Sequence, residues 1–153
     1  MNLNKDFEDL PETIFDKEFN LNIDLTSAGH AIRDDLAKAY NTYGRLNSMA
    51  AYASYLLDLA VSRKKEVEAL AWVALSGTRG FSVMKVAQRK IEVKKISIEI
   101  EGEKTTILRE QERVTKYKYF NERGKYKVKE MSSLLDLGRS MLSWDKTELD
   151  RLQ

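Results

Sequence analysis

The sequence has 153 residues, of which 42% are hydrophobic and 33% charged, with one proline, seven glycines and no cysteine. This length suits a single domain with a buried core, and so little proline and glycine disfavours a loop-rich or sandwich fold. The lack of cysteine excludes disulfides, thiolate metal sites and cysteine nucleophiles. Because no apolar run approaches 18 residues and no secretory signal is recognisable, we expect a cytoplasmic protein without a membrane span.

The net charge of +2 is unevenly distributed along the chain. Residues 1–25 carry two basic and seven acidic groups, whereas residues 76–130 carry fifteen basic and eight acidic groups. A basic middle favours a polyanionic partner, although lysines also serve only to keep a surface solvated. We expect an acidic leader at 1–25 and one helical domain at 26–153, with a basic hairpin or helical insertion at about 92–129.

A single long helix is predicted from about Ala28 to Leu75. Apolar residues recur there at alternating steps of three and four, and twelve of thirteen core positions are apolar, Lys64 being the exception. This period indicates a helix that packs along its whole length, as in a coiled coil or long hairpin. Gly44 is predicted to mark a bend or a close helix crossing, and Gly77 a left-handed helix end. We expect self-association through this seam, at Leu36, Tyr43, Leu46, Leu57 and Val67.

The period changes after the break at residues 76–80. A short helix is expected from Ser82 to Lys90, and β-branched residues on both sides of Glu101–Gly102–Glu103 then predict a β-hairpin. Two interpretations remain open for the following stretch: a second hairpin around residues 121–124, or a charged helix from Ile107 to Tyr119. Residues 131–152 are predicted to be helical. The fold class is therefore mainly α, a long helical hairpin or coiled-coil-like scaffold with a small β-hairpin insertion (α+β).

Residues suited to catalysis are scarce. His30 is the only histidine, which excludes two-histidine metal sites and cysteine–histidine pairs. The carboxylates follow helix faces or alternate with lysines, and no pair is distinguishable from surface charge. We therefore expect no enzymatic activity, no metal and no cofactor.

A basic segment interleaved with aromatic residues is the main candidate for binding. Cations that follow phosphates and rings that stack on bases are the composition of single-stranded nucleic-acid binders. The alternative is an amphipathic element whose rings pack on the core while its lysines face water. The candidate residues are Arg113, Lys116, Tyr117, Lys118, Tyr119, Phe120, Arg123, Lys125, Tyr126, Lys127 and Lys129.

The order of these features is similar to a group of small phage proteins. A tyrosine- and alanine-rich helix from Tyr40 to Leu70, a basic glycine-containing break at residues 76–80 and a closing helix at 133–142 (SLLDLGRSML) resemble recombination mediators of the UvsY type. That resemblance covers about two-thirds of the chain as a pattern. It implies helical homo-oligomers that bind single-stranded DNA and help to load a recombinase.

Our leading hypothesis is a homo-oligomeric, single-stranded DNA-binding accessory protein in phage recombination or replication, located in the host cytoplasm. Its partners would be single-stranded nucleic acid, further copies of itself and a recombinase or other protein. The first alternative is a phage-encoded factor that binds and inhibits a host enzyme or defence complex. The second is a structural or assembly protein, for which the long helix only mediates oligomerisation.

Overall fold

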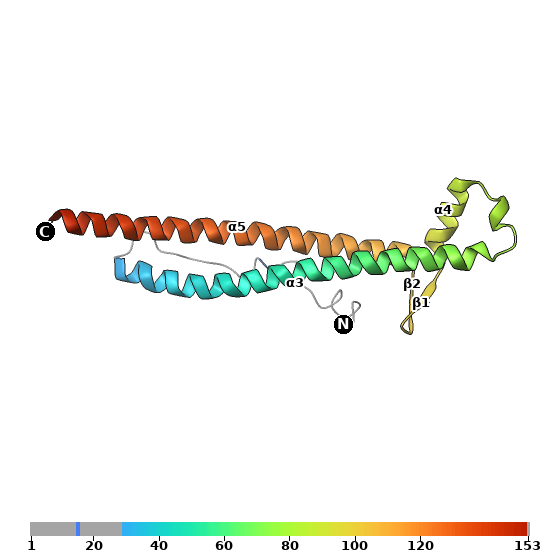
Figure 1. Cartoon of the computed structure of the whole chain (residues 1–153), viewed down its shortest axis with the longest axis horizontal. Helices are drawn as coiled ribbons and strands as arrows, with labels where there is room; N and C mark the ends of the chain where they lie inside the picture. Colours follow the sequence, from blue (N-terminus) through green and yellow to red (C-terminus); the bar gives the residue numbers. More distant parts are fainter. Residues whose placement is uncertain (1–14, 16–28, 153) are drawn as a thin grey trace. The chain divides into compact units, whose positions relative to one another are not determined.

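The computed structural model describes Phe15 and residues 29–152, most of which lie in two long helices (Figure 1). These helices are α3, Gly29–Ser76, and α5, Ile107–Leu152. Between them lie the 3-10 helix η1 (Phe81–Val83), helix α4 (Val86–Lys95) and strands β1 (Ile98–Ile100) and β2 (Glu103–Thr105). The predicted fold class, mainly α with a small β-hairpin, is confirmed. The acidic leader lies outside the described residues, apart from Phe15.

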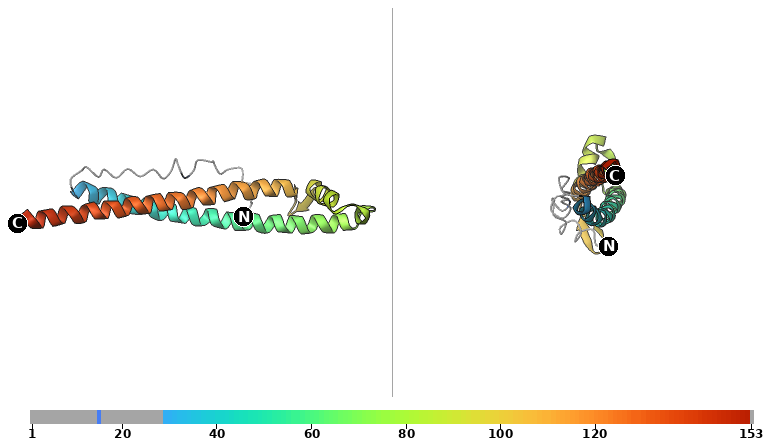
Figure 2. Two further views of the ribbon diagram at one scale, coloured as in Figure 1. Left: turned by 90° about the horizontal axis from the view of Figure 1, so that it is seen from above. Right: turned by 90° about the vertical axis from the view of Figure 1, so that its left-hand side faces the viewer.

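The chain forms two compact units, each of which is built from both long helices. Among the described residues, unit 1 comprises residues 54–119, and unit 2 comprises residues 29–53 and 120–152 together with Phe15. Within each unit the segments of α3 and α5 lie side by side and run in opposite directions, as the views in Figure 1 and Figure 2 agree.

The predicted periodicity of α3 corresponds to its buried face. Most of the thirteen core positions are buried, and Lys64 is half-buried beside Glu68, with 3.6 Å between the ammonium and a carboxylate oxygen. The buried positions are Ile32, Leu36, Ala39, Leu46, Ala53, Ala60, Val67 and Ala71. Alternating steps of three and four keep these side chains on one side of the helix, which is why this pattern predicts the element and its core correctly.

Unit 2 places glycines of α5 against bulky neighbours. Its core joins Ile32, Leu36 and Ala39 of α3 to Leu135 of α5. A Cβ built on Gly138 would lie 2.7 Å from Cδ2 of Leu36, so only a glycine lets the two side-chain layers approach this closely. The close crossing predicted at Gly44 is wrong, because a Cβ at that position meets nothing within 4 Å.

Unit 1 gathers its short elements around the C-terminal part of α3. Its core combines residues from four elements and the start of α5: Val67, Ala71, Phe81, Val93, Ile98, Ile100 and Ile107. The hairpin follows the predicted alternation, because Ile98 and Ile100 are buried and Glu99 between them is exposed. Its strands are antiparallel, with Ile100 opposite Glu103. The two loop residues, Glu101 and Gly102, have φ values of 51° and 80°, as a type I′ turn requires.

Three sequence interpretations are corrected by the backbone of the described residues. The second hairpin around residues 121–124 is not formed: residues 107–119 are helical, as the alternative predicted, and α5 continues through residues 121–124 to Leu152. The physical reason is the burial of Tyr117, Phe120, Asn121 and Gly124, whose spacing of three and four is that of a helix face. The left-handed residue after α3 is Gly80, with φ of 90°, and not Gly77. The short helix expected at 82–90 forms later, as α4.

Candidate nucleic-acid interface

The eleven predicted nucleic-acid-binding residues all lie on helix α5 and differ in how deeply they are buried. Arg113, Tyr117 and Phe120 are at most 1% exposed and face the cores of their units, so they are not accessible to a base or a phosphate. Lys116, Arg123 and Lys127 are half-buried. The exposed ones are Lys118 and Tyr119 in unit 1, and Lys125, Tyr126 and Lys129 in unit 2.

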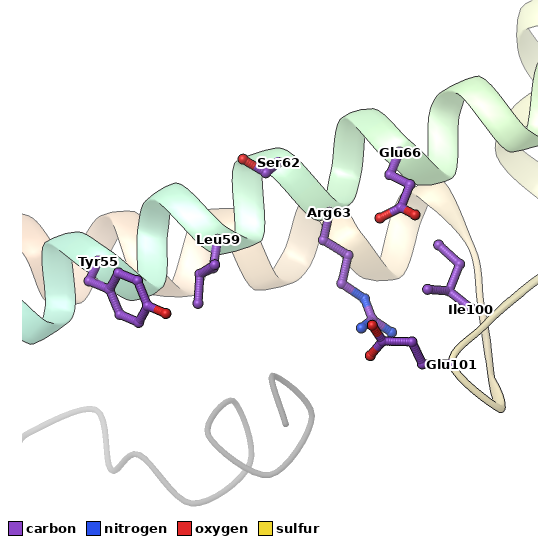
Figure 3. Close-up of a pocket in the computed structure, with 7 residues that line it drawn as sticks. All are labelled: Tyr55, Leu59, Ser62, Arg63, Glu66, Ile100 and Glu101. Carbon is purple, nitrogen blue, oxygen red and sulfur yellow. The ribbon is translucent and has the colours of Figure 1, made fainter. Parts of the chain in front are cut away.

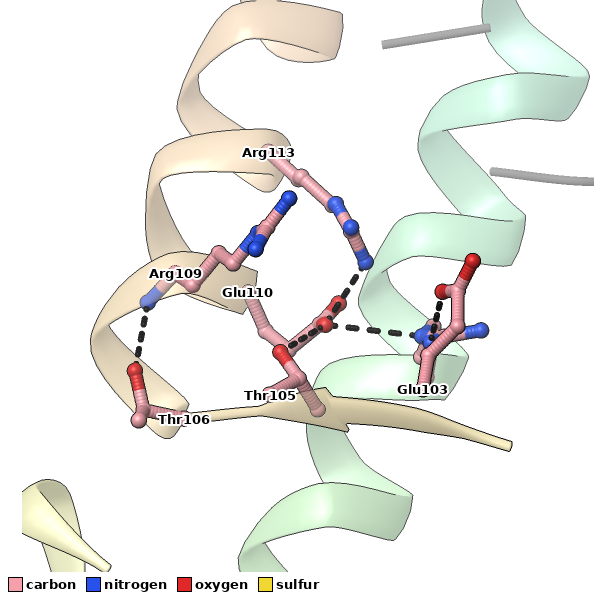
Figure 4. Close-up of polar contacts among 7 residues, drawn as sticks. Glu103, Thr105, Thr106, Arg109, Glu110 and Arg113 are labelled. Carbon is pink, nitrogen blue, oxygen red and sulfur yellow. Dashed lines mark hydrogen bonds and ion pairs between the residues drawn. The ribbon is translucent and has the colours of Figure 1, made fainter. Parts of the chain in front are cut away.

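Arg113 belongs to a buried ionic cluster in unit 1 (Figure 4). Its Nη1 donates to Oε1 of Glu110 over 2.7 Å, and the same oxygen accepts from the Thr105 hydroxyl over 2.6 Å. Arg63 of α3 lies 3.4 Å from that oxygen and 3.2 Å from Oε2 of Glu103. Two arginines and two glutamates thus balance in charge, and the cluster connects α3, β2 and α5. Arg113 therefore has a structural role, and its charge is neutralised within the cluster and is not available to a phosphate.

Two further cations of the predicted segment contact their own helix. Lys127 forms an ion pair with Glu130 at 3.1 Å, and the Arg123 guanidinium lies 5.5 Å from the centre of the Tyr126 ring. Lys125 and Lys129 are exposed and form no ion pair with any residue that the structure describes. The predicted segment therefore keeps only part of its binding potential, on the exposed side of α5.

A stronger concentration of free positive charge lies at residues 76–95, which we call the basic tip. This stretch has six basic residues and one acidic residue, a net charge of +5 in a chain whose total is +2. Five of the six cations are exposed, and none of these five is ion-paired within the described part of the chain: Arg79, Lys85, Lys90, Lys94 and Lys95.

Helix α4 presents much of this charge on one side. At 100° per residue, Ile91 and Lys95 lie opposite the buried Val93, while Lys90 and Lys94 lie on one flank between them and Val93, and all four side chains are exposed. Ile91 is 52% exposed, and Val86 and Val83 nearby are 64% and 84% exposed. These exposed apolar side chains beside the lysines make this part of the basic tip a candidate interaction surface.

An indole ring lies at the base of the basic tip. Trp72 of α3 contacts Phe81 edge to face, with ring centres 5.7 Å apart, and remains 39% exposed. The Arg89 guanidinium covers Phe81 at 5.7 Å from its centre, and its nitrogens donate to the carbonyls of Met84 and Ser82. Arg89 thereby holds the turn before α4 against the rings. Sequence reasoning missed Trp72, whose only signal is an aromatic residue outside the core period near a basic break.

Other kinds of site find little support among the described residues. No group of three histidine, aspartate or glutamate side chains lies close enough there to hold a metal ion. None of the helices in that part of the chain is both long and apolar enough to cross a membrane. Comparisons with protein-family models, with curated protein sequences and with solved structures find no match to this chain.

Proposed function

We propose that the protein is a non-catalytic, single-stranded nucleic-acid-binding accessory protein whose main contact surface is the basic tip. The observation that carries this proposal is the set of five exposed, unpaired cations beside exposed apolar side chains and the half-exposed Trp72. Cations that neutralise phosphates supply most of the affinity in such complexes, and an accessible indole ring stacks on bases without reading their identity. Single-stranded DNA in phage recombination or replication is the form of this function that the sequence resemblance predicts.

The test compares three triple variants that each remove three exposed positive charges. The first alters the basic tip: Lys90→Gln, Lys94→Gln and Lys95→Gln. The second alters the exposed side of α5: Lys118→Gln, Lys125→Gln and Lys129→Gln. The third is a control for net charge, at exposed lysines elsewhere on the long helices: Lys38→Gln, Lys65→Gln and Lys146→Gln.

Fluorescence anisotropy with a labelled single-stranded oligonucleotide measures the affinity of each variant. We expect the tip variant to bind about tenfold more weakly or worse, while the charge control stays within about twofold of the unaltered protein. Equal losses in all three variants would show that only net charge matters and would overturn the assignment to the tip. Absence of oligonucleotide binding at low salt, or binding only to anionic lipid vesicles, would overturn the proposed function.

Trp72 provides an independent readout of the same surface. In a Trp144→Phe background it is the only tryptophan, so a base that stacks on its ring should quench the fluorescence on addition of oligonucleotide. Trp72→Leu should weaken binding of single strands by about tenfold, since a stacked base contributes about 1–3 kcal/mol. Unchanged fluorescence at saturating oligonucleotide would remove the stacking role and leave only phosphate contacts.

A further inference from the structure

Unit 1 also contains a surface pocket that the proposed nucleic-acid contact does not use (Figure 3). Its volume is about 300 Å³, and seven residues of α3, β1 and the hairpin turn line it. This size lies at the lower end of the range for ligand pockets, roughly 300–1,000 Å³. Its lining residues are Tyr55, Leu59, Ser62, Arg63, Glu66, Ile100 and Glu101.

The walls of the pocket have two chemical characters. Leu59 and Ile100 supply aliphatic surface, and the Tyr55 ring extends it at one end in Figure 3. Glu66 of α3 and Glu101 of the hairpin turn supply carboxylates, and both side chains are drawn toward the other end. A ligand that matches these walls has an aliphatic stem and a polar head at one end.

The charge of the pocket determines the sign of that head. Arg63 is neutralised by Glu103 at 3.2 Å and by Glu110 at 3.4 Å, inside the balanced cluster described above. Glu66 and Glu101 are exposed, and neither forms an ion pair with a described residue. The lining side chains therefore carry a net charge of −1, and since Arg63 is already paired, the two unpaired carboxylates give the pocket an acidic end that repels the phosphates that the basic tip attracts.

We propose that this pocket binds an arginine or lysine side chain of a partner protein. The aliphatic stem of that side chain packs on Leu59 and Ile100, while its cationic head donates charge-assisted hydrogen bonds to the carboxylates of Glu66 and Glu101. A free polyamine fits less well, because it carries cations at both ends of its stem and the carboxylates occupy only one end of the pocket. The inference is independent of the nucleic-acid contact, since it uses different residues of unit 1.

The test is an NMR titration of the full-length ¹⁵N-labelled protein with N-acetyl-arginine amide. Its matched control is N-acetyl-citrulline amide, which keeps the stem and the planar head but has no charge. We expect saturable shifts of the amide signals of Leu59, Ile100 and Glu101 with the arginine compound, and at least tenfold weaker binding of the citrulline compound. Equal binding of both compounds, or no shift with either, would overturn the proposal.

A pair of double variants separates this pocket from general acidity. Glu66→Gln with Glu101→Gln should abolish the preference for arginine over citrulline. Glu99→Gln with Glu112→Gln removes the same charge from exposed side chains that do not line the pocket and should leave that preference unchanged. All four residues are exposed, so both variants should fold. If the control loses as much affinity as the pocket variant, the binding is nonspecific attraction and the pocket has no specific role.

Discussion

Glycine has opposite consequences at two helical positions of unit 2. Gly44 lies in the interior of α3 with open space where a Cβ would be, whereas the Cβ of an alanine at 138 would meet Leu36. Replacing an interior helical glycine by alanine stabilises a helix by up to about 1 kcal/mol, while overpacking a core costs about 1–3 kcal/mol. The environment of each glycine therefore decides the sign of the same substitution.

We expect Gly44→Ala to raise the free energy of unfolding by about 0.5–1 kcal/mol. Gly138→Ala should lower it by about 1 kcal/mol, because Leu36 is buried and has to move before a methyl group fits. Urea denaturation of both variants measures the difference. An equal gain for the two would mean that Leu36 adapts without loss and that the close approach is not a constraint.

Glu110 is the second residue whose environment sets a strong expectation. It is fully buried, and its Oε1 accepts hydrogen bonds from Arg113 and Thr105 and forms an ion pair with Arg63. Removing the charge of Glu110 therefore leaves the two arginines with too little negative charge. We expect Glu110→Gln to lower the free energy of unfolding by about 3 kcal/mol. The exposed neighbour Glu112 is the control, and Glu112→Gln should change it by less than about 0.5 kcal/mol. A loss below about 1 kcal/mol for Glu110→Gln would contradict the structural role of the cluster.

Among the elements, the hairpin turn has at its first central position a residue that this type of turn does not prefer. A type I′ turn prefers asparagine, aspartate or glycine at its first central position, and this chain has Glu101 there with φ of 51°. We expect Glu101→Asn to raise the free energy of unfolding by about 0.5–1 kcal/mol and at the same time to weaken arginine binding at the pocket. Thermal denaturation and the NMR titration measure the two effects. A stabilised variant with unchanged arginine binding would show that the turn, and not the carboxylate, is what position 101 supplies.

Elements with a strong hydrophobic period were predictable from sequence, and those that depend on tertiary contacts were not. The period of α3 and the alternation of Ile98 and Ile100 each identify a buried face without knowledge of the partner. Residues 117–128 contain β-formers and a glycine, which favour a hairpin locally. They are helical because Phe120 is buried in the core and Gly124 packs closely beside Ala50.

The candidate site was predictable only in its general composition. The basic, aromatic character of the middle of the chain is visible in the sequence, but burial is not. Arg113 is buried in its ion pair with Glu110 and is not available for binding, whereas the lysines of α4 stay exposed. Trp72 lies outside the basic tip in sequence and is placed beside it by its contact with Phe81, nine residues further along the chain.

For the molecule as a whole, the position of charge matters more than its total. If binding depended on net charge, the affinity of a protein of net charge +2 would depend only weakly on salt. In the proposed complex, the five cations of the basic tip instead contact phosphates as a local group. For single strands the slope of log affinity against log salt is about −0.7 for each phosphate neutralised, so we expect a slope near −3.5. The tip variant should reduce this slope by about 2, as measured by titrations between about 50 and 200 mM salt. A slope near zero in the unaltered protein would contradict phosphate contacts.

The seam of α3 bears on self-association. Leu36, Leu46 and Val67, three of the five residues predicted for it, are buried within their own units, and Tyr43 and Leu57 are half-buried. Self-association through this seam therefore stays a prediction, for which Tyr43 and Leu57 keep partly exposed surface. We expect Leu46→Ala to lower the free energy of unfolding by about 2–4 kcal/mol, as for a core leucine. The loss should be equal at low and high protein concentration; a loss that depends on concentration would place Leu46 between subunits.

The two tryptophans give each unit its own optical label. Trp72 belongs to unit 1 and Trp144 to unit 2, and both are partly in contact with solvent. Single-tryptophan variants therefore report the melting of each unit separately within one continuous chain. Coincident transitions would show that α3 and α5 transmit folding cooperativity along their length, whereas two distinct midpoints would rank the units by stability. The accessible surface of these rings thus makes the division of the fold directly measurable.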